Sequence, residues 1–205
     1  MSALSYPTQY ESDVVLRDGS TVRLRPIRPN DGDAVRTLYE RVSRDSLRFR
    51  FFGIPAACDE EVSRLLSADH DNKFVLIAEA GDRVAGVALY IRDPKSPERA
   101  EVAFTIADAL HGRGIGTRML ETLASIARGH HIRTFDAYVL QDNQRMMGVF
   151  LDSGFAVERR LEGGVFHVAL SLEPTAVYEA KAAERSQSAA TASRASYRLL
   201  GGNVR

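Results

Sequence analysis

Residues 110–117, LHGRGIGT, contain three glycines at alternate positions, Gly112, Gly114 and Gly116. Glycine lets the backbone turn tightly and approach a ligand closely. A helix that starts within this segment would add unpaired N–H groups and a partial positive charge. We therefore expect the loop to hold an anion, and a pyrophosphate fits it well.

The flanking patterns place this loop between a strand and a helix. Residues 100–108, AEVAFTIAD, are rich in apolar and β-branched side chains and predict a buried strand. Downstream, apolar residues recur at helical spacing, namely Ile115, Met119, Leu120, Leu123, Ile126 and Ala127. Three glycines alone are also typical of a flexible surface turn, but these flanks favour a binding loop. The spacing matches neither the dinucleotide fingerprint GxGxxG nor the phosphate loop GxxxxGK[ST], which argues against NAD and ATP.

Residues 111–116, HGRGIG, resemble the Q/R-x-x-G-x-G/A motif of the GNAT superfamily of acetyl-CoA-dependent N-acetyltransferases. His111 stands where that family usually has Gln or Arg. Backbone N–H groups supply most of the hydrogen bonds to the phosphates in such a loop, so a histidine at this position affects only one side-chain contact. The resemblance implies acetyl-CoA as cosubstrate.

A second segment strengthens this resemblance. Residues 143–155, NQRMMGVFLDSGF, follow an apolar strand at 134–140 and are similar to the family pattern N-x-x-A/M-x-x-[LV]-[YF]-x-x-x-G-F. Asn143 suits the start of a short helix and Gly154 suits its end. An ordinary capped helix without a binding role would have the same residues at these positions. Phe150 stands where the family often has a tyrosine that protonates the departing thiolate. A thiol has a pKa near about 8.5, so the thiolate can leave without that acid.

The resemblance implies which residues contact acetyl-CoA. Backbone groups of Phe104, Thr105 and Ile106 are expected to pair with the pantetheine arm, and a nearby N–H to polarise the thioester carbonyl. The remaining expected cofactor contacts are His111, Gly112, Arg113, Gly114, Ile115, Gly116, Thr117, Asn143 and Met147. Arg113 or Arg118 is expected to meet a further phosphate.

Acetyl transfer to a lysine needs a base, because fewer than about one lysine amine in a thousand is neutral at pH 7. Glu101 is the charged residue inside the strand segment AEVAFTI, and alternation places it with Ala103 and Thr105 on one face. We expect its carboxylate to be partly desolvated there. The alternative from the pattern alone is a strand-end carboxylate paired with Arg99.

The segment 100–103, AEVA, resembles that of the Pat-type protein lysine acetyltransferases within GNAT, which implies Glu101 as general base. Residues 18–53 resemble the opening of the same group, with a hairpin at Asp18-Gly19 and a helix capped by Asn30 or Asp31. The run 47–52 is consistent with a lining of the acceptor side, but we interpret it as a helix whose phenylalanines pack in the core and whose arginines are solvated. The habitual acceptors of this group are acyl-CoA synthetases.

Composition sets the remaining expectations. The chain has 205 residues, 27 basic and 27 acidic side chains, and no net charge, so no global field favours nucleic acid or an anionic membrane. The single Cys58 excludes an internal disulfide and fits a reducing compartment. The sequence shows no signal-peptide core, membrane-length apolar run, HExxH or CxxC, so we expect a cytoplasmic protein without a metal.

The order of elements predicts an α/β, GNAT-like three-layer fold, in which helices flank a mixed, mostly antiparallel sheet. We expect a strand hairpin at 13–26, helices within 31–67, strands at 73–80, 83–91 and 99–107, a helix at 114–129, a strand at 133–140, a helix at 143–153, and strands at 155–161 and 164–172. The predicted acetyltransferase domain covers residues 1–173. Residues 174–205, rich in Ala, Ser and charge, predict a linker or a marginal helix. The resemblance implies either a stand-alone relative of the Pat-type enzymes or the amino-terminal piece of a longer protein.

Two other functions share the same cofactor residues. A small-molecule amine N-acetyltransferase would differ only in its acceptor pocket. A non-catalytic acyl-CoA sensor would keep the glycine loop but would not need Glu101. Transfer to a protein lysine is the interpretation that the resemblance favours.

Overall fold

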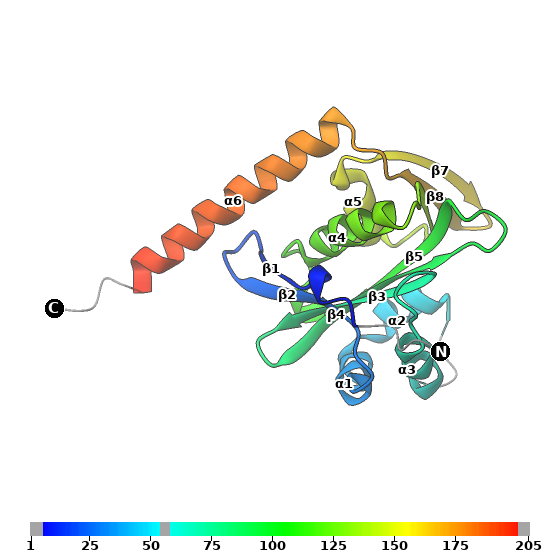
Figure 1. Ribbon diagram of the computed structural model, residues 1–205, viewed down its shortest axis with the longest axis horizontal. Coiled ribbons are helices and arrows are strands. Elements are labelled where there is room, and N and C mark those ends of the chain that lie inside the picture. Colours follow the sequence, from blue (N-terminus) through cyan, green and yellow to red (C-terminus); the bar gives the residue numbers. More distant parts are fainter. Residues whose placement is uncertain (1–5, 54–57, 201–205) are drawn as a thin grey trace.

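The computed structural model describes residues 6–53 and 58–200 as a twisted sheet with helices on both faces (Figure 1). The eight strands lie in the order β1-β2-β3-β4-β5-β6-β8-β7, and all neighbours are antiparallel except β5 and β6. The strands are Ser12–Val15 (β1), Thr21–Pro26 (β2), Lys73–Ala80 (β3), Arg83–Arg92 (β4), Arg99–Ile106 (β5), Thr134–Leu140 (β6), Ala156–Glu162 (β7) and Val165–Ser171 (β8). The mixed, mostly antiparallel sheet predicted from the sequence is confirmed.

Helices cover the two faces unequally. On one face lie α4 (Ile115–Gly129) and α5 (Gln144–Ser153), and on the other lie α1 (Gly32–Arg41), α2 (Arg44–Phe51) and α3 (Cys58–Leu66) (Figure 1). Strand alternation divides the core accordingly: Phe74 and Leu76 belong to the α4 side, while Val75 and Ile77 belong to the α1 side. The apolar stripe predicted on α4 is buried from Ile115 to Ala127. The helix expected at 114–129 thus joins two parallel strands, as predicted.

Strands β5 and β6 pair over a short distance only. Their ladder joins Arg99 with Thr134, Ala100 with Phe135 and Glu101 with Asp136, and then stops. The remainder of β5 has a sheet partner on the β4 side alone, up to Ile106. Backbone groups on the other edge of β5 therefore lack a strand partner, and a gap opens between the two strands.

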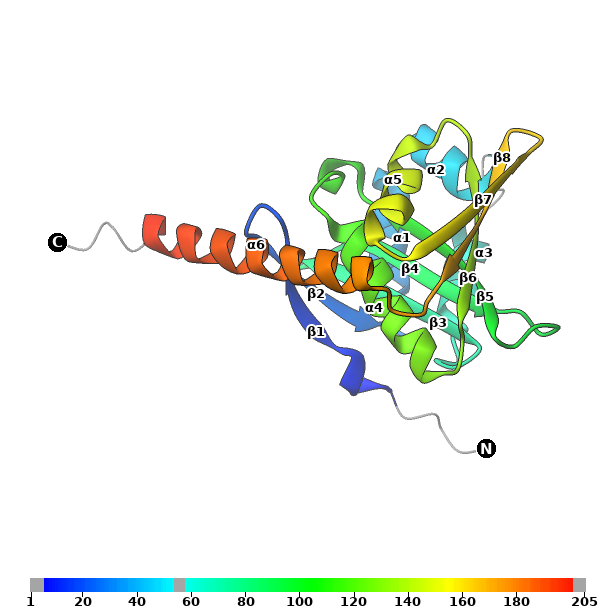
Figure 2. The ribbon, with the colours of Figure 1, turned by 90° about the horizontal axis from the view of Figure 1, so that it is seen from above.

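The chain after Pro174 forms α6 (Ala176–Leu200), where the sequence indicated a linker or a marginal helix. Its first turns pack on the domain: Tyr178 stacks on Phe155 with ring centroids 4.3 Å apart, and the Arg185 Nε donates to Glu121 Oε1 at 2.7 Å. The rest of α6 extends past the β1–β2 hairpin and away from the sheet (Figure 2). No helix among residues 6–53 and 58–200 is long and apolar enough to span a membrane.

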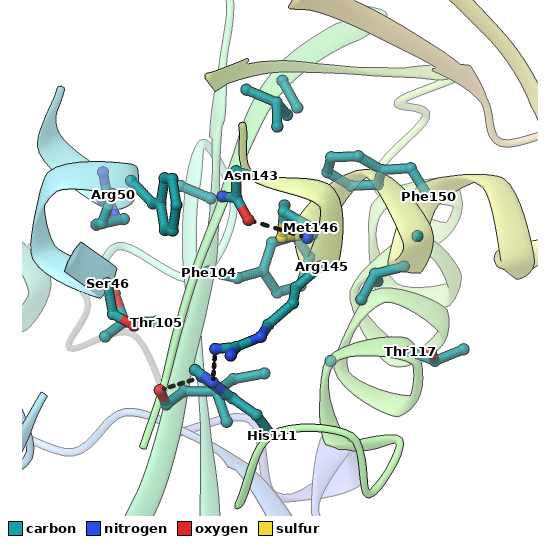
Figure 3. A pocket seen from close by; sticks show the side chains of 18 of the residues that line it. Ser46, Arg50, Phe104, Thr105, His111, Thr117, Asn143, Arg145, Met146 and Phe150 are labelled. Carbon is teal, nitrogen blue, oxygen red and sulfur yellow. Dashed lines mark hydrogen bonds between the residues drawn. The ribbon is translucent and has the colours of Figure 1, made fainter. Parts of the chain in front are cut away.

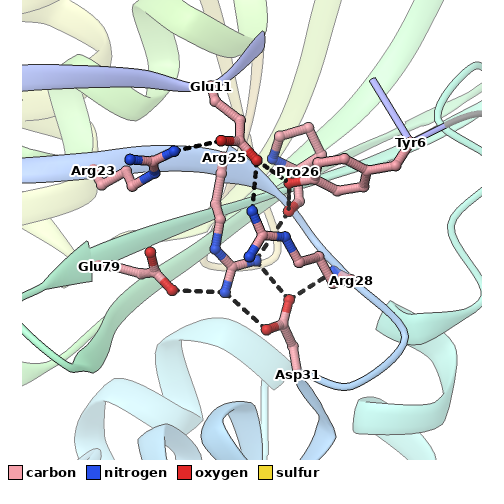
Figure 4. A network of polar contacts seen from close by, with 8 residues as sticks. All are labelled: Tyr6, Glu11, Arg23, Arg25, Pro26, Arg28, Asp31 and Glu79. Carbon is pink, nitrogen blue, oxygen red and sulfur yellow. Dashed lines mark hydrogen bonds and ion pairs between the residues drawn. The ribbon is translucent and has the colours of Figure 1, made fainter. Parts of the chain in front are cut away.

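A buried ion network ties the first hairpin to α1 and β3 (Figure 4). Arg25 donates to both carboxylate oxygens of Asp31, each at 2.7 Å, and to Glu79 at 2.7 Å. Asp31 is the N-cap residue of α1, one of the two predicted, but its side chain makes no cap hydrogen bond, because its carboxylate binds Arg25 and the N–H of Arg28. Glu11 accepts from Arg23, Arg28 and Tyr6 beside this network.

We expect Asp31→Asn to lower the free energy of unfolding by about 3 kcal/mol, because it leaves the buried Arg25 with one carboxylate partner fewer. The control is Asp33→Asn, which breaks an exposed pair with Arg36 and should change stability by less than about 1 kcal/mol. Urea denaturation of both variants measures the difference. Equal stability of the two would contradict a structural role for the buried pair.

Acid should weaken the fold partly through Glu11. Hydrogen bonds from Arg23, Arg28 and Tyr6 lower its pKa from 4.5 to about 2. A carboxylate with a lower pKa in the folded state stabilises the protein above the unfolded value, and this contribution is lost as the pH falls toward 2. The difference in the free energy of unfolding between wild type and Glu11→Gln should therefore decrease as the pH falls from about 5 to 2. A difference that stays constant over this range would exclude that linkage.

Candidate active site

A cavity of about 350 Å³ lies at the gap between β5 and β6 (Figure 3). Its walls come from β5 residues 101–106, from β6 residues 137–139, from the glycine loop, and from residues of α2 and α5. Phe104 of β5 meets Phe150 of α5 edge-on, with ring centroids 6.2 Å apart. The cavity therefore runs from the glycine loop along the unpaired edge of β5 to Glu101.

The glycine loop forms the start of α4 as the sequence predicts. Gly114 is the residue before the helix and has a φ of 92°, a left-handed conformation that favours glycine. No side chain caps this helix start, so its first N–H groups are available to a ligand. A Cβ at Gly116 would lie 3.2 Å from Ile106 Cδ1 and 3.3 Å from Val149 Cγ2, so glycine also permits the close packing of α4 on β5 and α5.

Ten of the twelve residues expected to contact the cofactor line this cavity: Phe104, Thr105, Ile106, His111, Gly112, Gly114, Ile115, Gly116, Thr117 and Asn143. Arg113 and Met147 are outside the lining. The Arg113 side chain is directed to Asp18, at 3.4 Å, and Met147 is buried in the core on the α4 side. Asn143 accepts a hydrogen bond from the Met146 N–H at 3.1 Å and so caps α5, as predicted.

The His111 ring joins two elements around the loop. Its Nε2 lies 2.9 Å from the carbonyl oxygen of Ile106, and its Nδ1 lies 2.8 Å from Nη1 of Arg145 (Figure 3). Because Arg145 can only donate and a carbonyl can only accept, His111 must carry its proton on Nε2. The side chain that replaces the usual Gln or Arg is therefore engaged by protein groups.

Glu101 lines the cavity at the last ladder pair before β5 and β6 separate. Arg99 does not pair with it, since its guanidinium binds Asp136 at 2.9 Å through Nε and at 2.5 Å through Nη2. The expected partial desolvation of Glu101 is wrong, because the residue is exposed. Glu101 shares its face of the sheet with Ala103, on the side of α1, α2 and α3, and these helices leave its carboxylate in contact with solvent.

Helix α2 forms one side of the cavity mouth and is held at two points. Asp108 accepts from Ser43 N–H at 2.8 Å and from the Ser46 hydroxyl at 2.7 Å. Arg48 donates to Asp142 at 2.6 Å, and this hydrogen bond lowers the pKa of Asp142. These contacts join α2 to the loops that follow β5 and β6.

The mouth contains residues of the run 47–52 together with residues that no sequence pattern indicates. Phe52 and Tyr138 line it with 48% and 51% exposure. Of the run 47–52, Phe49, Arg50 and Phe52 line the cavity, whereas Leu47 and Phe51 pack against the core, so both interpretations of that run hold in part. Arg17 and Arg145 are further lining residues without a local sequence signal. Within the described ranges, no cluster of three His, Cys, Asp or Glu side chains is placed to hold a metal ion.

Residues 38–155 match the model of the acetyltransferase (GNAT) family, and this match includes the glycine loop and the Asn143 segment. The chain belongs to the GNAT acetyltransferase family. The segment before residue 38, with the β1–β2 hairpin and Arg25, lies outside that match.

Two relatives are Pat proteins. The chain is 32% identical over 165 residues to the acetyltransferase Pat of Mycolicibacterium smegmatis. The aligned region covers 78% of this chain and 49% of that relative. The chain thus spans about half the length of that curated relative. The crystal structure of the GNAT domain of S. lividans PAT is 36% identical, with a TM-score of 0.75, and covers 82% of this chain and 99% of that one.

A more distant structure shares the fold. It is the putative acetyltransferase yncA from Salmonella typhimurium with its cofactor acetyl-CoA, 17% identical with a TM-score of 0.61. The match covers 76% of this GNAT chain and 96% of that chain.

We expect Gly114→Ala to weaken binding of coenzyme A by about tenfold, because an alanine in the left-handed conformation costs about 1–2 kcal/mol and the loop should change shape to avoid it. Gly129→Ala is the matched control, since a Cβ there meets open space and the residue ends α4 without a positive φ. Isothermal titration with coenzyme A gives both affinities. Unchanged binding by the Gly114 variant would contradict the role of this backbone geometry.

Proposed function

We propose that this chain transfers an acetyl group from acetyl-CoA to the ε-amine of a lysine on a protein, with Glu101 as general base. The observation that carries this proposal is the continuous cavity from the α4 N-terminus to Glu101 along the unpaired edge of β5. A long, extended thioester with a charged end fits this shape. Acetyl-CoA has that form, and the family acts as acetyltransferases.

The two ends of the substrate have separate positions. The pyrophosphate lies at the N–H groups of the first turn of α4. The pantetheine arm extends along residues 104–106, where its amides replace the strand partner that β5 lacks. The thioester then lies near the β5–β6 junction, and a backbone N–H of β5 polarises its carbonyl.

In this proposal Glu101 receives the proton of the attacking amine, directly or through one water molecule. The amine nitrogen forms a bond to the thioester carbonyl carbon, and the bond from that carbon to sulfur breaks with departure of the CoA thiolate. Both substrates are bound when this transfer occurs. Because Glu101 is exposed, the proton it accepts passes to solvent.

The thiolate leaves without an acid at the position of Phe150. This side chain is 1% exposed and packs edge-on against Phe104, so it shapes the cavity and supplies no proton. A thiol pKa near about 8.5 makes the thiolate an adequate leaving group near neutral pH.

The acceptor end favours a lysine on a protein surface. Glu101, Phe52 and Tyr138 are all exposed at the mouth. A site for a small amine would enclose most of its ligand, whereas an open mouth admits a side chain that projects from a larger molecule. The likeness to Pat proteins supports the same acceptor class, and we propose an acyl-CoA synthetase as the target.

We expect Glu101→Gln to lower kcat for acetyl transfer by a factor of about 100 to 10,000, the usual contribution of a positioned base, with little effect on the KM for acetyl-CoA. The control is Glu98→Gln, an exposed glutamate near the start of the same strand that does not line the cavity. Labelled acetyl-CoA, a purified acetyl-CoA synthetase and a panel of small amines, tested between about pH 6 and 9, provide the assay.

Label in the synthetase that falls with Glu101→Gln and not with Glu98→Gln supports the proposal. Transfer only to small amines would instead assign a small-molecule N-acetyltransferase. Binding of coenzyme A without transfer to either acceptor would favour an acyl-CoA sensor.

A further inference from the structure

Three arginines line the cavity, and they differ in their partners. Arg50 is paired with Glu61 at 3.2 Å on the acceptor side. Arg17 and Arg145 lie at the glycine-loop end, and neither has a carboxylate within 4.0 Å among residues 6–53 and 58–200. Two guanidinium groups without counter-ions therefore border the place where the charged end of a ligand would lie.

Arg17 reaches the loop from the turn between β1 and β2. A Cβ built on Gly114 would lie 3.6 Å from Arg17 Cγ and 3.7 Å from its Nε, so the side chain covers that glycine. The Arg17 N–H also contacts the carbonyl oxygen of Arg113 at 3.5 Å. The hairpin thus places a cation directly over the helix start.

Arg145 reaches the loop from a different element, α5. Figure 3 shows its side chain extending from the first turn of α5 to His111, where Nη1 donates to Nδ1. His111 is fixed in turn by its bond to the Ile106 carbonyl at the end of β5. The remaining guanidinium N–H groups of Arg145 are available to a ligand oxygen.

The other arginines near the loop are engaged elsewhere. Arg113 is paired with Asp18 at 3.4 Å. Arg118 is paired with Glu121 at 3.0 Å, and Glu121 also binds Arg185 of α6. Neither Arg113 nor Arg118 lines the cavity, although the sequence analysis expected one of them to meet a phosphate.

We propose that Arg17 and Arg145 bind the phosphates of acyl-CoA from two sides of the glycine loop, and that His111 acts as the positioning residue for Arg145. This inference rests on the proposed function, since it concerns the same ligand. It also explains His111: the phosphate-binding cation comes from α5, and the histidine at the motif's first position holds it in place.

The test measures affinities for coenzyme A, 3′-dephospho-coenzyme A and pantetheine, which carries no phosphate, by isothermal titration. Arg17→Met and Arg145→Met should each weaken coenzyme A binding by about tenfold to a hundredfold, as expected for loss of a charge-assisted hydrogen bond. Binding of pantetheine should change by less than about twofold. Arg160→Met, an exposed change on β7 outside the cavity, is the control.

The comparison of coenzyme A with 3′-dephospho-coenzyme A identifies which phosphate each arginine contacts. If a variant binds coenzyme A more weakly than the wild type but binds dephospho-coenzyme A equally well, the substituted arginine contacts the 3′-phosphate. If its affinity for dephospho-coenzyme A is also reduced, the arginine contacts the pyrophosphate. Either result supports the proposal. Wild-type affinity for coenzyme A in both variants would overturn it, as would an equal loss of pantetheine binding. If the wild type itself does not bind coenzyme A, the proposed function fails.

A double-mutant cycle tests the role of His111. If His111 acts through Arg145, His111→Asn should weaken binding less than His111→Ala, because the Asn side-chain oxygen is able to accept from Arg145. His111→Ala should have a smaller effect in the Arg145→Met background than in wild type. Fully additive effects would show that His111 acts independently of Arg145, and thermal unfolding of each variant checks that the loop remains folded.

Discussion

Strands β5 and β6 share three ladder pairs, and their separation beyond Glu101 and Asp136 is the constraint on which the site depends. The short parallel ladder holds β5 and β6 together at one end. Beside the opening, Phe150 of α5 packs against Phe104 of β5. Backbone groups on the open edge of β5 need polar partners, and we propose that a bound pantetheine arm supplies them. The glycine loop and Glu101 lie at opposite ends of this opening.

Much of the fold could be predicted from local sequence patterns. The strands at 73–80 and 99–107 and the helix at 114–129 agree with β3, β5 and α4 to within one residue at either end, because alternation and helical spacing were both strong there. The turn at Gly163-Gly164 also follows from sequence, since both residues have positive φ in the observed hairpin. Strand β5 and helix α4 place the glycine loop between them as predicted.

Other features depend on contacts between distant segments. Arg17 is 97 residues from Gly114 in the chain, and no local pattern indicates that it covers that glycine. Asp is a residue type that often caps helices, but the carboxylate of Asp31 accepts hydrogen bonds from the buried Arg25 instead. The exposure of Glu101 depends on how the helices on its face of the sheet are placed, and alternation along β5 does not give their positions. Sequence patterns located the glycine loop, whereas the arginines that line the cavity beside it are evident only from the tertiary structure.

The most direct measurement is residue-resolved amide hydrogen exchange of the wild-type protein with and without coenzyme A. If the pantetheine arm completes the open edge of β5, amides between Val102 and Ile106 should exchange more slowly when the ligand is bound, together with those at the start of α4. Protection confined to α4, with no change along β5, would contradict the account, because the ligand would then bind the loop without entering the gap between the strands.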